Sequence, residues 1–110
     1  MAKAPSEFVL YLEDALGELG PVERTRFFGG WSFSMRGARF AYVLRGKLYF
    51  PVDAPLRAAL AAEGCGPFEY EKRGRTVTVA RFHEAPSACL DDPDALLEWA
   101  ARSARAAGAM

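Results

Sequence analysis

Cysteine and histidine are scarce in this 110-residue sequence, which contains two Cys and one His. Cys65 and Cys89 form no Cys-x-x-Cys pair, and His83 has no second His with which to complete a zinc set. We therefore expect neither a disulfide framework nor a bound metal. No motif in the sequence indicates a cofactor.

Long apolar runs are also missing. No stretch approaches the roughly 18 apolar residues that a membrane-spanning helix needs. The segment from Met1 to Glu7 lacks the basic-then-apolar order of a signal peptide. We therefore expect a cytoplasmic protein with reduced thiols and no membrane partner.

An excess charge of one sign is absent from the chain as a whole, since 14 basic and 14 acidic side chains balance. The charges are nevertheless unevenly distributed. Residues 1–23 hold one base and five acids, residues 24–81 hold eleven bases and four acids, and residues 82–110 hold two bases and five acids. The middle of the chain is therefore the part that could attract an anionic partner.

The composition is that of a globular protein, with 51% hydrophobic and 25% charged residues. A chain of this length fits one domain of ordinary size. We predict a single domain over residues 1–110 with a core spanning about residues 6–104.

Three helices are predicted from apolar residues at helical spacing and from capping residues. The first begins near Ser6 and ends at Gly20-Pro21. The second begins at Asp53 and ends near Gly64. The third begins at Asp91 or Asp92, with Pro93 in its first turn, and the chain after Arg102 is expected to fray.

Period-two alternation predicts strands over residues 31–35, 40–44, 47–50, 68–71 and 76–82. Tight turns are expected at Arg36-Gly37, Arg45-Gly46 and Arg73-Gly74, since Gly tolerates positive φ. These elements predict an α+β fold in two layers, with an antiparallel sheet of about five strands and helices on one side. The predicted order is α-β-β-β-α-β-β-α.

Several motifs, in order, resemble the N-terminal domain of the TfoX/Sxy family, bacterial proteins linked to the regulation of natural competence. The resemblance covers Phe8 to about Ala104. Its most specific parts are Arg26-Phe27-Phe28-Gly29-Gly30-Trp31, Leu48-Tyr49-Phe50 before Val52-Asp53, Gly64 to Phe68 before Tyr70-Glu71-Lys72, and Leu90 to Pro93 before Leu97 and Trp99.

The chain departs from the family pattern at three positions: Phe27 replaces a usual Met, Ser32 a common Gly and Pro51 a typical Lys. Longer family members carry a second, C-terminal domain, and the resemblance covers the N-terminal domain alone. It implies a two-layer, secretion-chaperone-like fold that often dimerises, and a regulatory role without catalytic residues.

Potential catalytic or ligand-binding groups each have a simpler interpretation. Gly29-Gly30 could hold a phosphate, but a strand follows where such a loop requires a helix, which favours a turn or bulge. His83 has no nucleophile at a recognisable spacing and is expected at a surface or strand end. Cys89 is a better candidate for an activated thiol than Cys65, although inert thiols are the ordinary case for both.

Aromatic and basic residues interleave along the predicted sheet and suggest an interaction surface. The candidate residues are Arg26, Phe28, Gly29, Gly30, Trp31, Arg36, Arg39, Arg45, Lys72, Arg73 and Arg75. An uncovered sheet face or edge favours a protein partner, either a second copy of the chain or, as the resemblance implies, a transcription factor. Nucleic acid is the alternative, and it requires the bases to converge on one patch.

Overall fold

The computed structural model describes residues 5–110, so the first four residues of the predicted domain lie outside it. The elements follow one another as α1 (Glu7–Leu16), η1 (Gly17–Leu19), β1 (Glu23–Phe27), β2 (Gly30–Met35), β3 (Ala38–Leu44), β4 (Lys47–Pro51), α2 (Ala54–Ala62), β5 (Pro67–Lys72), β6 (Arg75–Glu84), η2 (Ser87–Leu90) and α3 (Pro93–Ala107). None of the helices in this described range has the length and apolar character of a membrane span.

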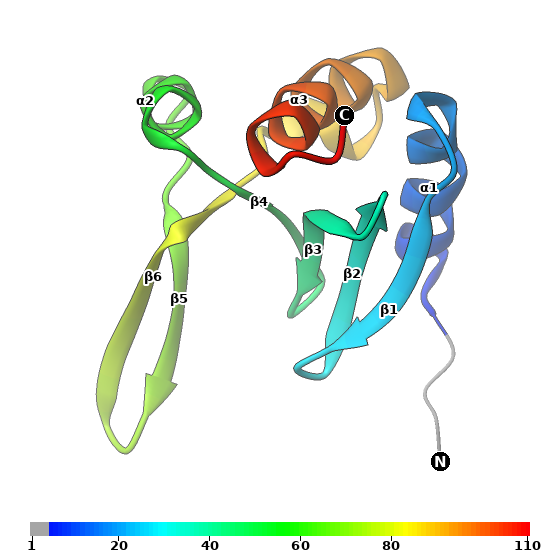
Figure 1. Cartoon of the computed structure of the whole chain (residues 1–110). Helices are drawn as coiled ribbons and strands as arrows, with labels where there is room; N and C mark the ends of the chain where they lie inside the picture. Colours follow the sequence, from blue (N-terminus) through cyan, green and yellow to red (C-terminus); the bar gives the residue numbers. More distant parts are fainter. Residues whose placement is uncertain (1–4) are drawn as a thin grey trace.

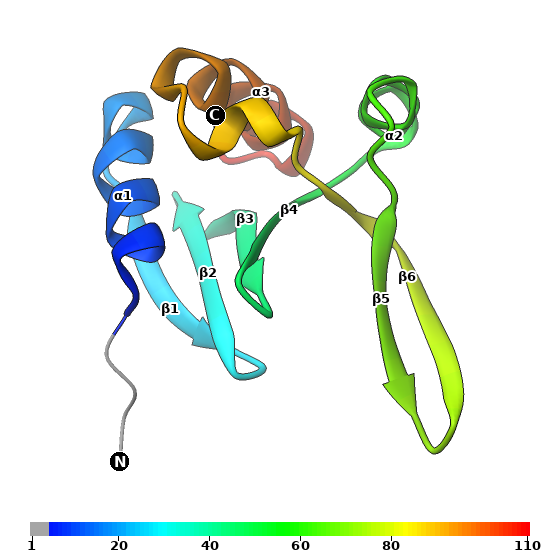
Figure 2. The ribbon, with the colours of Figure 1, turned by 180° about the vertical axis from the view of Figure 1, so that it is seen from behind.

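The six strands form one antiparallel sheet in the order β1-β2-β3-β4-β6-β5. All three helices lie on one side of it (Figures 1 and 2). The predicted α+β class and the one-sided arrangement are confirmed, with six strands where about five were expected. The additional strand, β1, has four polar residues among its five, which hides it from a search for apolar alternation.

Capping residues define the helix starts as the sequence predicts. The side chain of Ser6 accepts a hydrogen bond from the Val9 amide, and that of Asp53 accepts one from the Leu56 amide. The side chain of Asp92 accepts hydrogen bonds from the two amides that open α3. These contacts satisfy backbone donors that no helical carbonyl can reach.

The end of α3 differs from the prediction, because the helix continues past Arg102 to Ala107 and does not fray. Ser103 and Ala104 are fully buried against the sheet. The Ser103 hydroxyl lies 2.8 Å from the Phe40 carbonyl oxygen and 3.2 Å from that of Pro51, and it can donate to either. Small side chains let α3 approach β3 closely, an effect that hydrophobic periodicity does not reveal.

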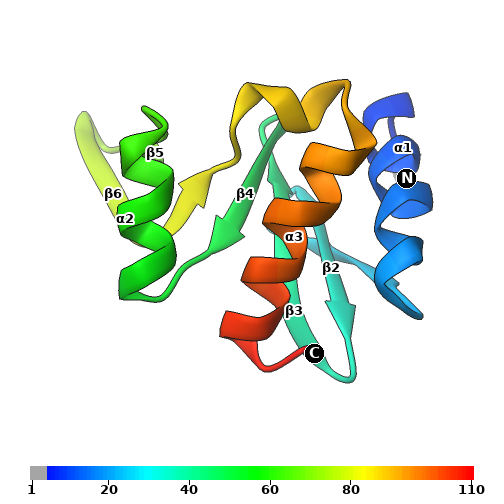
Figure 3. The same ribbon diagram turned by 90° about the horizontal axis from the view of Figure 1, so that it is seen from above.

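Alternate residues of the central strands supply two separate apolar clusters. On β3, Ala41 and Val43 face the helices and join the main core, whereas Tyr42 and Leu44 belong to a second cluster on the other face. Seen from above, α3 lies over β3, with β4 beside it (Figure 3). The main core therefore lies between this layer of helices and the sheet, while the second cluster faces away from the helices.

The hairpin of β5 and β6 bends out of the sheet. Pro67 pairs with His83, but the next residue of β5, Phe68, pairs with Val79, so residues 80–82 have no partner on β5. Unpaired residues in one strand bend it and increase its twist. The hairpin projects away from the helices as a result (Figure 1).

Candidate functional site

The helix-free face of the sheet carries the second apolar cluster. Its buried members are Tyr42, Leu44, Tyr49 and Phe82, each no more than 7% exposed, and Phe27, Phe68 and Val79 pack against them. No helix covers this face (Figures 1 and 2). An aromatic cluster outside the main core is a common feature of interaction surfaces.

The rings of this cluster hold one another in place. The ring centroids of Tyr42 and Phe82 lie 4.5 Å apart, and those of Phe27 and Tyr42 lie 4.8 Å apart. Tyr49 and Phe68 meet edge to face at 5.1 Å. These distances are typical of favourable aromatic pairs, so the strands present a preorganised aromatic surface.

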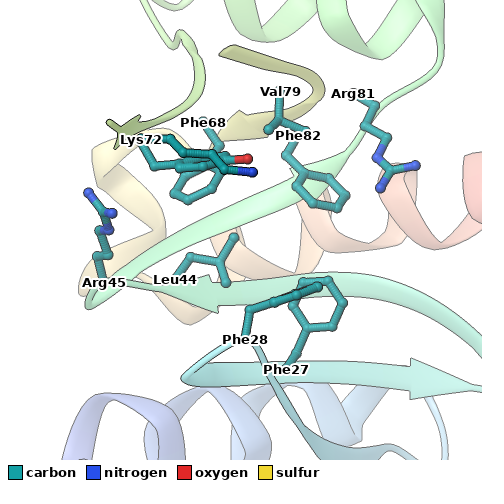
Figure 4. A pocket seen from close by; sticks show the side chains of 10 residues that line it. Phe27, Phe28, Leu44, Arg45, Phe68, Lys72, Val79, Arg81 and Phe82 are labelled. Carbon is teal, nitrogen blue, oxygen red and sulfur yellow. The ribbon is translucent and has the colours of Figure 1, made fainter. Parts of the chain in front are cut away.

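A groove of about 490 Å³ opens over this cluster. We refer to it as the sheet groove, and it is lined by Phe27, Phe28, Leu44, Arg45, Phe68, Tyr70, Lys72, Val79, Arg81 and Phe82. Figure 4 shows Phe27 and Phe28 on one side of Leu44, with Phe68 and Lys72 on the other. The bend of the β5–β6 hairpin thus creates the second wall.

Every charged residue that lines the sheet groove is basic. Arg45 comes from the β3–β4 turn, Lys72 from the end of β5 and Arg81 from the part of β6 that has no partner on β5. The acids of β5 alternate with its groove residues and face the other way, where Glu69 and Glu71 accept hydrogen bonds from threonine hydroxyls at 3.1 and 3.0 Å. The hairpin therefore separates bases from acids onto opposite faces.

Two guanidinium groups cover the faces of rings in the cluster. Arg39 lies 5.4 Å from the centroid of Phe27, and Arg81 lies 5.1 Å from that of Phe82. Both distances allow a cation–π attraction. Burial also raises the pKa of Tyr42 above its usual 10.0, although these two arginines oppose the shift, so its hydroxyl is neutral at physiological pH.

Phe28 is the most conspicuous residue at the sheet groove. It is 92% exposed and adopts a φ of +43° in the turn between β1 and β2, followed by Gly29 at +78°. Left-handed backbone is unfavourable for a bulky L-residue, and a fully exposed ring gains little from burial. Its edge-to-face contact with Phe27, at 4.7 Å, directs this ring toward the cluster.

Three of the predicted interaction residues line the sheet groove, and two more lie next to it, since Arg39 lies over the ring of Phe27 and Arg75 pairs with Lys72. Phe28, Arg45 and Lys72 line the groove. Arg36 occupies the β2–β3 turn, while Arg73 and Arg75 lie at or beside the β5–β6 turn.

The remaining predicted residues have mainly structural environments. Trp31 packs against the main core, with the guanidinium groups of Arg24 and Arg26 4.9 and 4.8 Å from its ring. Gly29 completes a turn, and Gly30 begins β2, where an added Cβ would lie 1.9 Å from the Val43 carbonyl oxygen. The interpretation of Gly29-Gly30 as a turn at a strand start agrees with this geometry.

Several groove residues were absent from the predicted interaction residues, namely Phe27, Leu44, Phe68, Tyr70, Val79, Arg81 and Phe82. One signal could have identified part of this set. Phe68, Tyr70 and Lys72 alternate along one strand and must therefore face the same way. The bend at residues 80–82, which aligns them with Leu44, has no such signal.

The thiols of Cys65 and Cys89 and the imidazole of His83 lie outside the sheet groove. Cys65 and Cys89 are free. Burial raises the pKa of Cys89 to about 12, and nearby Cys65 adds to the shift. Cys89 therefore does not form a thiolate readily, and the prediction that it is the better candidate for an activated thiol is wrong. His83 lies at a strand end, next to the last residue of β6, but it is 5% exposed rather than at the surface. Its buried Nδ1 has no hydrogen-bond partner. Burial lowers the pKa of His83.

Metal ligands do not gather in the described part of the chain, since no group of three or more His, Cys, Asp or Glu side chains is placed to hold an ion. The sheet groove offers aromatic surface and three cations, which suits binding more than chemistry.

Comparison with known proteins supports a family assignment. A search of curated proteins finds no match to the chain. The family model for the TfoX N-terminal domain matches residues 14–107. This segment includes all six strands, α2 and α3, and every residue that lines the sheet groove. The chain therefore belongs to the TfoX N-terminal domain family.

Proposed function

We propose that this chain is a non-enzymatic adaptor domain that binds a protein partner through the sheet groove. The groove combines a preorganised apolar floor with a polar, basic rim, the arrangement found in the centre and margin of protein interfaces. Membership of the TfoX N-terminal domain family supports a partner that acts in transcription regulation.

The single observation that carries the proposal is Phe28. A 92% exposed ring at a φ of +43° contributes little to folding, and its conformation is unfavourable by about 1 kcal/mol relative to Asn or Gly. Strained and exposed aromatic residues are characteristic of binding sites, where a partner buries the ring. Phe28 stands directly beside the groove, where a bound segment would cover it.

Nucleic acid fits this surface less well. Strand binding stacks successive bases on open rings, yet Arg39 covers Phe27 and Arg81 covers Phe82, while Phe28 is a single fully exposed ring. A phosphate backbone also requires a track of bases, and the groove lining itself supplies three, Arg45, Lys72 and Arg81. The groove is therefore better suited to the side chains of a protein.

A second copy of the chain is also a poor occupant of the groove. A twofold dimer places the same surface on both partners. The groove of one copy would then meet the groove of the other, so the bases Arg45, Lys72 and Arg81 of both copies would come together with no groove acid to neutralise them. We propose a different protein as the occupant for this reason.

Site-specific photo-crosslinking tests the proposal. A photoreactive phenylalanine replaces Phe28 in one variant and Leu10 in the control, because Leu10 is a 47% exposed apolar residue on α1 outside the groove. We expect the Phe28 variant, but not the Leu10 variant, to crosslink one defined protein in cells. That protein, once purified, should bind the wild-type chain and lose most of its affinity for Phe28→Asn.

Three results would contradict the proposal. Crosslinking to DNA or RNA would support the nucleic-acid alternative, and crosslinking to the chain itself would support a homodimer. Equal crosslinking from positions 28 and 10 would show that the sheet groove is not a specific site.

A further inference from the structure

We propose that the occupant of the sheet groove is a short acidic segment that carries large apolar side chains. This inference rests on the proposed function and adds the chemistry of the partner. It follows from three features of the groove: the sign of its charges, its size and the arrangement of its rings.

The charge argument begins with the β5–β6 hairpin. Glu69 and Glu71 point away from the groove and are engaged by Thr78 and Thr76, so they cannot neutralise the groove bases directly. The groove itself contains Arg45, Lys72 and Arg81 and no carboxylate. A neutral or basic segment would add no counter-charge to these cations, whereas an acidic segment supplies carboxylates at the rim.

The apolar argument concerns the centre of the groove. Leu44 lies between the Phe27–Phe28 pair and the Phe68–Lys72 wall (Figure 4). Its neighbours are rings that meet edge to face or at a tilt, so they leave an uneven apolar surface. Leu, Ile or aromatic side chains fit such a surface by shape and by loss of water.

The size argument limits the length of the segment. A volume of about 490 Å³ falls within the ~300–1,000 Å³ typical of concave ligand sites and is far smaller than a whole domain interface. The groove can therefore accept a few side chains from one extended or helical segment. Acids on either side of these side chains would reach Arg45 and Arg81, which extend toward opposite ends of the view in Figure 4.

Unbiased peptide selection tests the inference. A random 12-residue phage library is selected on the purified wild-type chain and counter-selected on Phe28→Asn. Enriched peptides are synthesised with a fluorescent label, and their affinity is measured by polarisation at low and high salt. Each peptide is compared with one version in which Lys replaces the acids and another in which Ser replaces the apolar residues. Labelled oligo-dT serves as the nucleic-acid probe.

Matched variants of the chain connect binding to the groove. Arg45→Asn removes a groove base, and Arg36→Asn makes the same change at an equivalent turn position with the same φ of +53° outside the groove. We expect acidic, apolar peptides to bind the wild type, to weaken at least about tenfold with Phe28→Asn and about threefold with Arg45→Asn, and to ignore Arg36→Asn. Higher salt should weaken their binding.

The outcomes separate this inference from the proposed function. Selected peptides that require Phe28 but are neutral or basic would overturn the acidic occupant and leave protein binding in the groove intact. Selection of no peptide that requires Phe28, or salt-sensitive binding of oligo-dT that Phe28→Asn abolishes, would overturn both.

Discussion

Replacing Phe28 by Asn should remove binding without weakening the fold. The change relieves left-handed strain, which for a bulky residue is about 1 kcal/mol. Because the ring is 92% exposed, only about 16 Å² of a side chain of ~200 Å² leaves a buried environment, worth about 0.4 kcal/mol. Loss of the 4.7 Å contact with Phe27 removes about 0.5 kcal/mol more.

These contributions nearly cancel, so the expected change in the free energy of unfolding is about +0.1 kcal/mol, which corresponds to a change in Tm of about 1 °C or less. Urea unfolding followed by circular dichroism measures this change, with an unaltered m-value as the sign that only stability is affected. Arg36→Asn is the control, since it relieves the same strain in an equivalent turn without removing a ring.

A structural role for Phe28 would give a different result. Truncation of a ring that supports the core destabilises a protein by about 3 to 5 kcal/mol. A loss of more than about 1 kcal/mol in Phe28→Asn, with no loss in Arg36→Asn, would refute the assignment of Phe28 to binding.

Three further predictions concern the scaffold. Gly30→Ala should destabilise the fold by about 3 kcal/mol in urea unfolding, because the added Cβ would lie 1.9 Å from a backbone oxygen of β3. Gly29→Ala is the control, since nothing lies close to a Cβ at that position, and an equal loss of stability in both variants would contradict this reasoning. Ser103→Ala should lower the free energy of unfolding by about 1 to 2 kcal/mol, since it removes a buried donor, and an unchanged midpoint would show that the hydrogen bond contributes nothing. The free energy of unfolding should fall between pH 7 and pH 5, because burial lowers the pKa of His83 in the folded state and the unfolded chain takes up the proton first. His83→Gln should flatten this pH dependence, and a slope that persists in the variant would assign it to another group.

Local chemistry made much of the fold predictable. Arg36-Gly37, Arg45-Gly46 and Arg73-Gly74 form the expected turns with positive φ at both residues. Asp53 and Asp92 cap helices as their positions indicate. Each of these features depends on a few adjacent residues, so the sequence contains all of the necessary information.

Elements that depend on distant contacts were harder to predict. The edge strand β1 is stabilised by pairing with β2 and has little apolar content of its own. The end of α3 is held by the hydrogen bond that Ser103 donates to β3 or β4, which are more than 50 residues away in the chain. Neither the helical spacing of apolar residues nor the general tendency of chain ends to fray indicates such contacts.

The sequence by itself determined the alternation along the strands, since Ala41 and Val43 alternate with Tyr42 and Leu44 along β3. It also determined that bases are concentrated in the middle of the chain. Only the tertiary structure decided which face the helices cover and which bases border the other. The sheet order and the bend at residues 80–82 place Lys72 and Phe28 along one groove, because proximity between distant residues follows from the path of the backbone and not from their spacing in the chain.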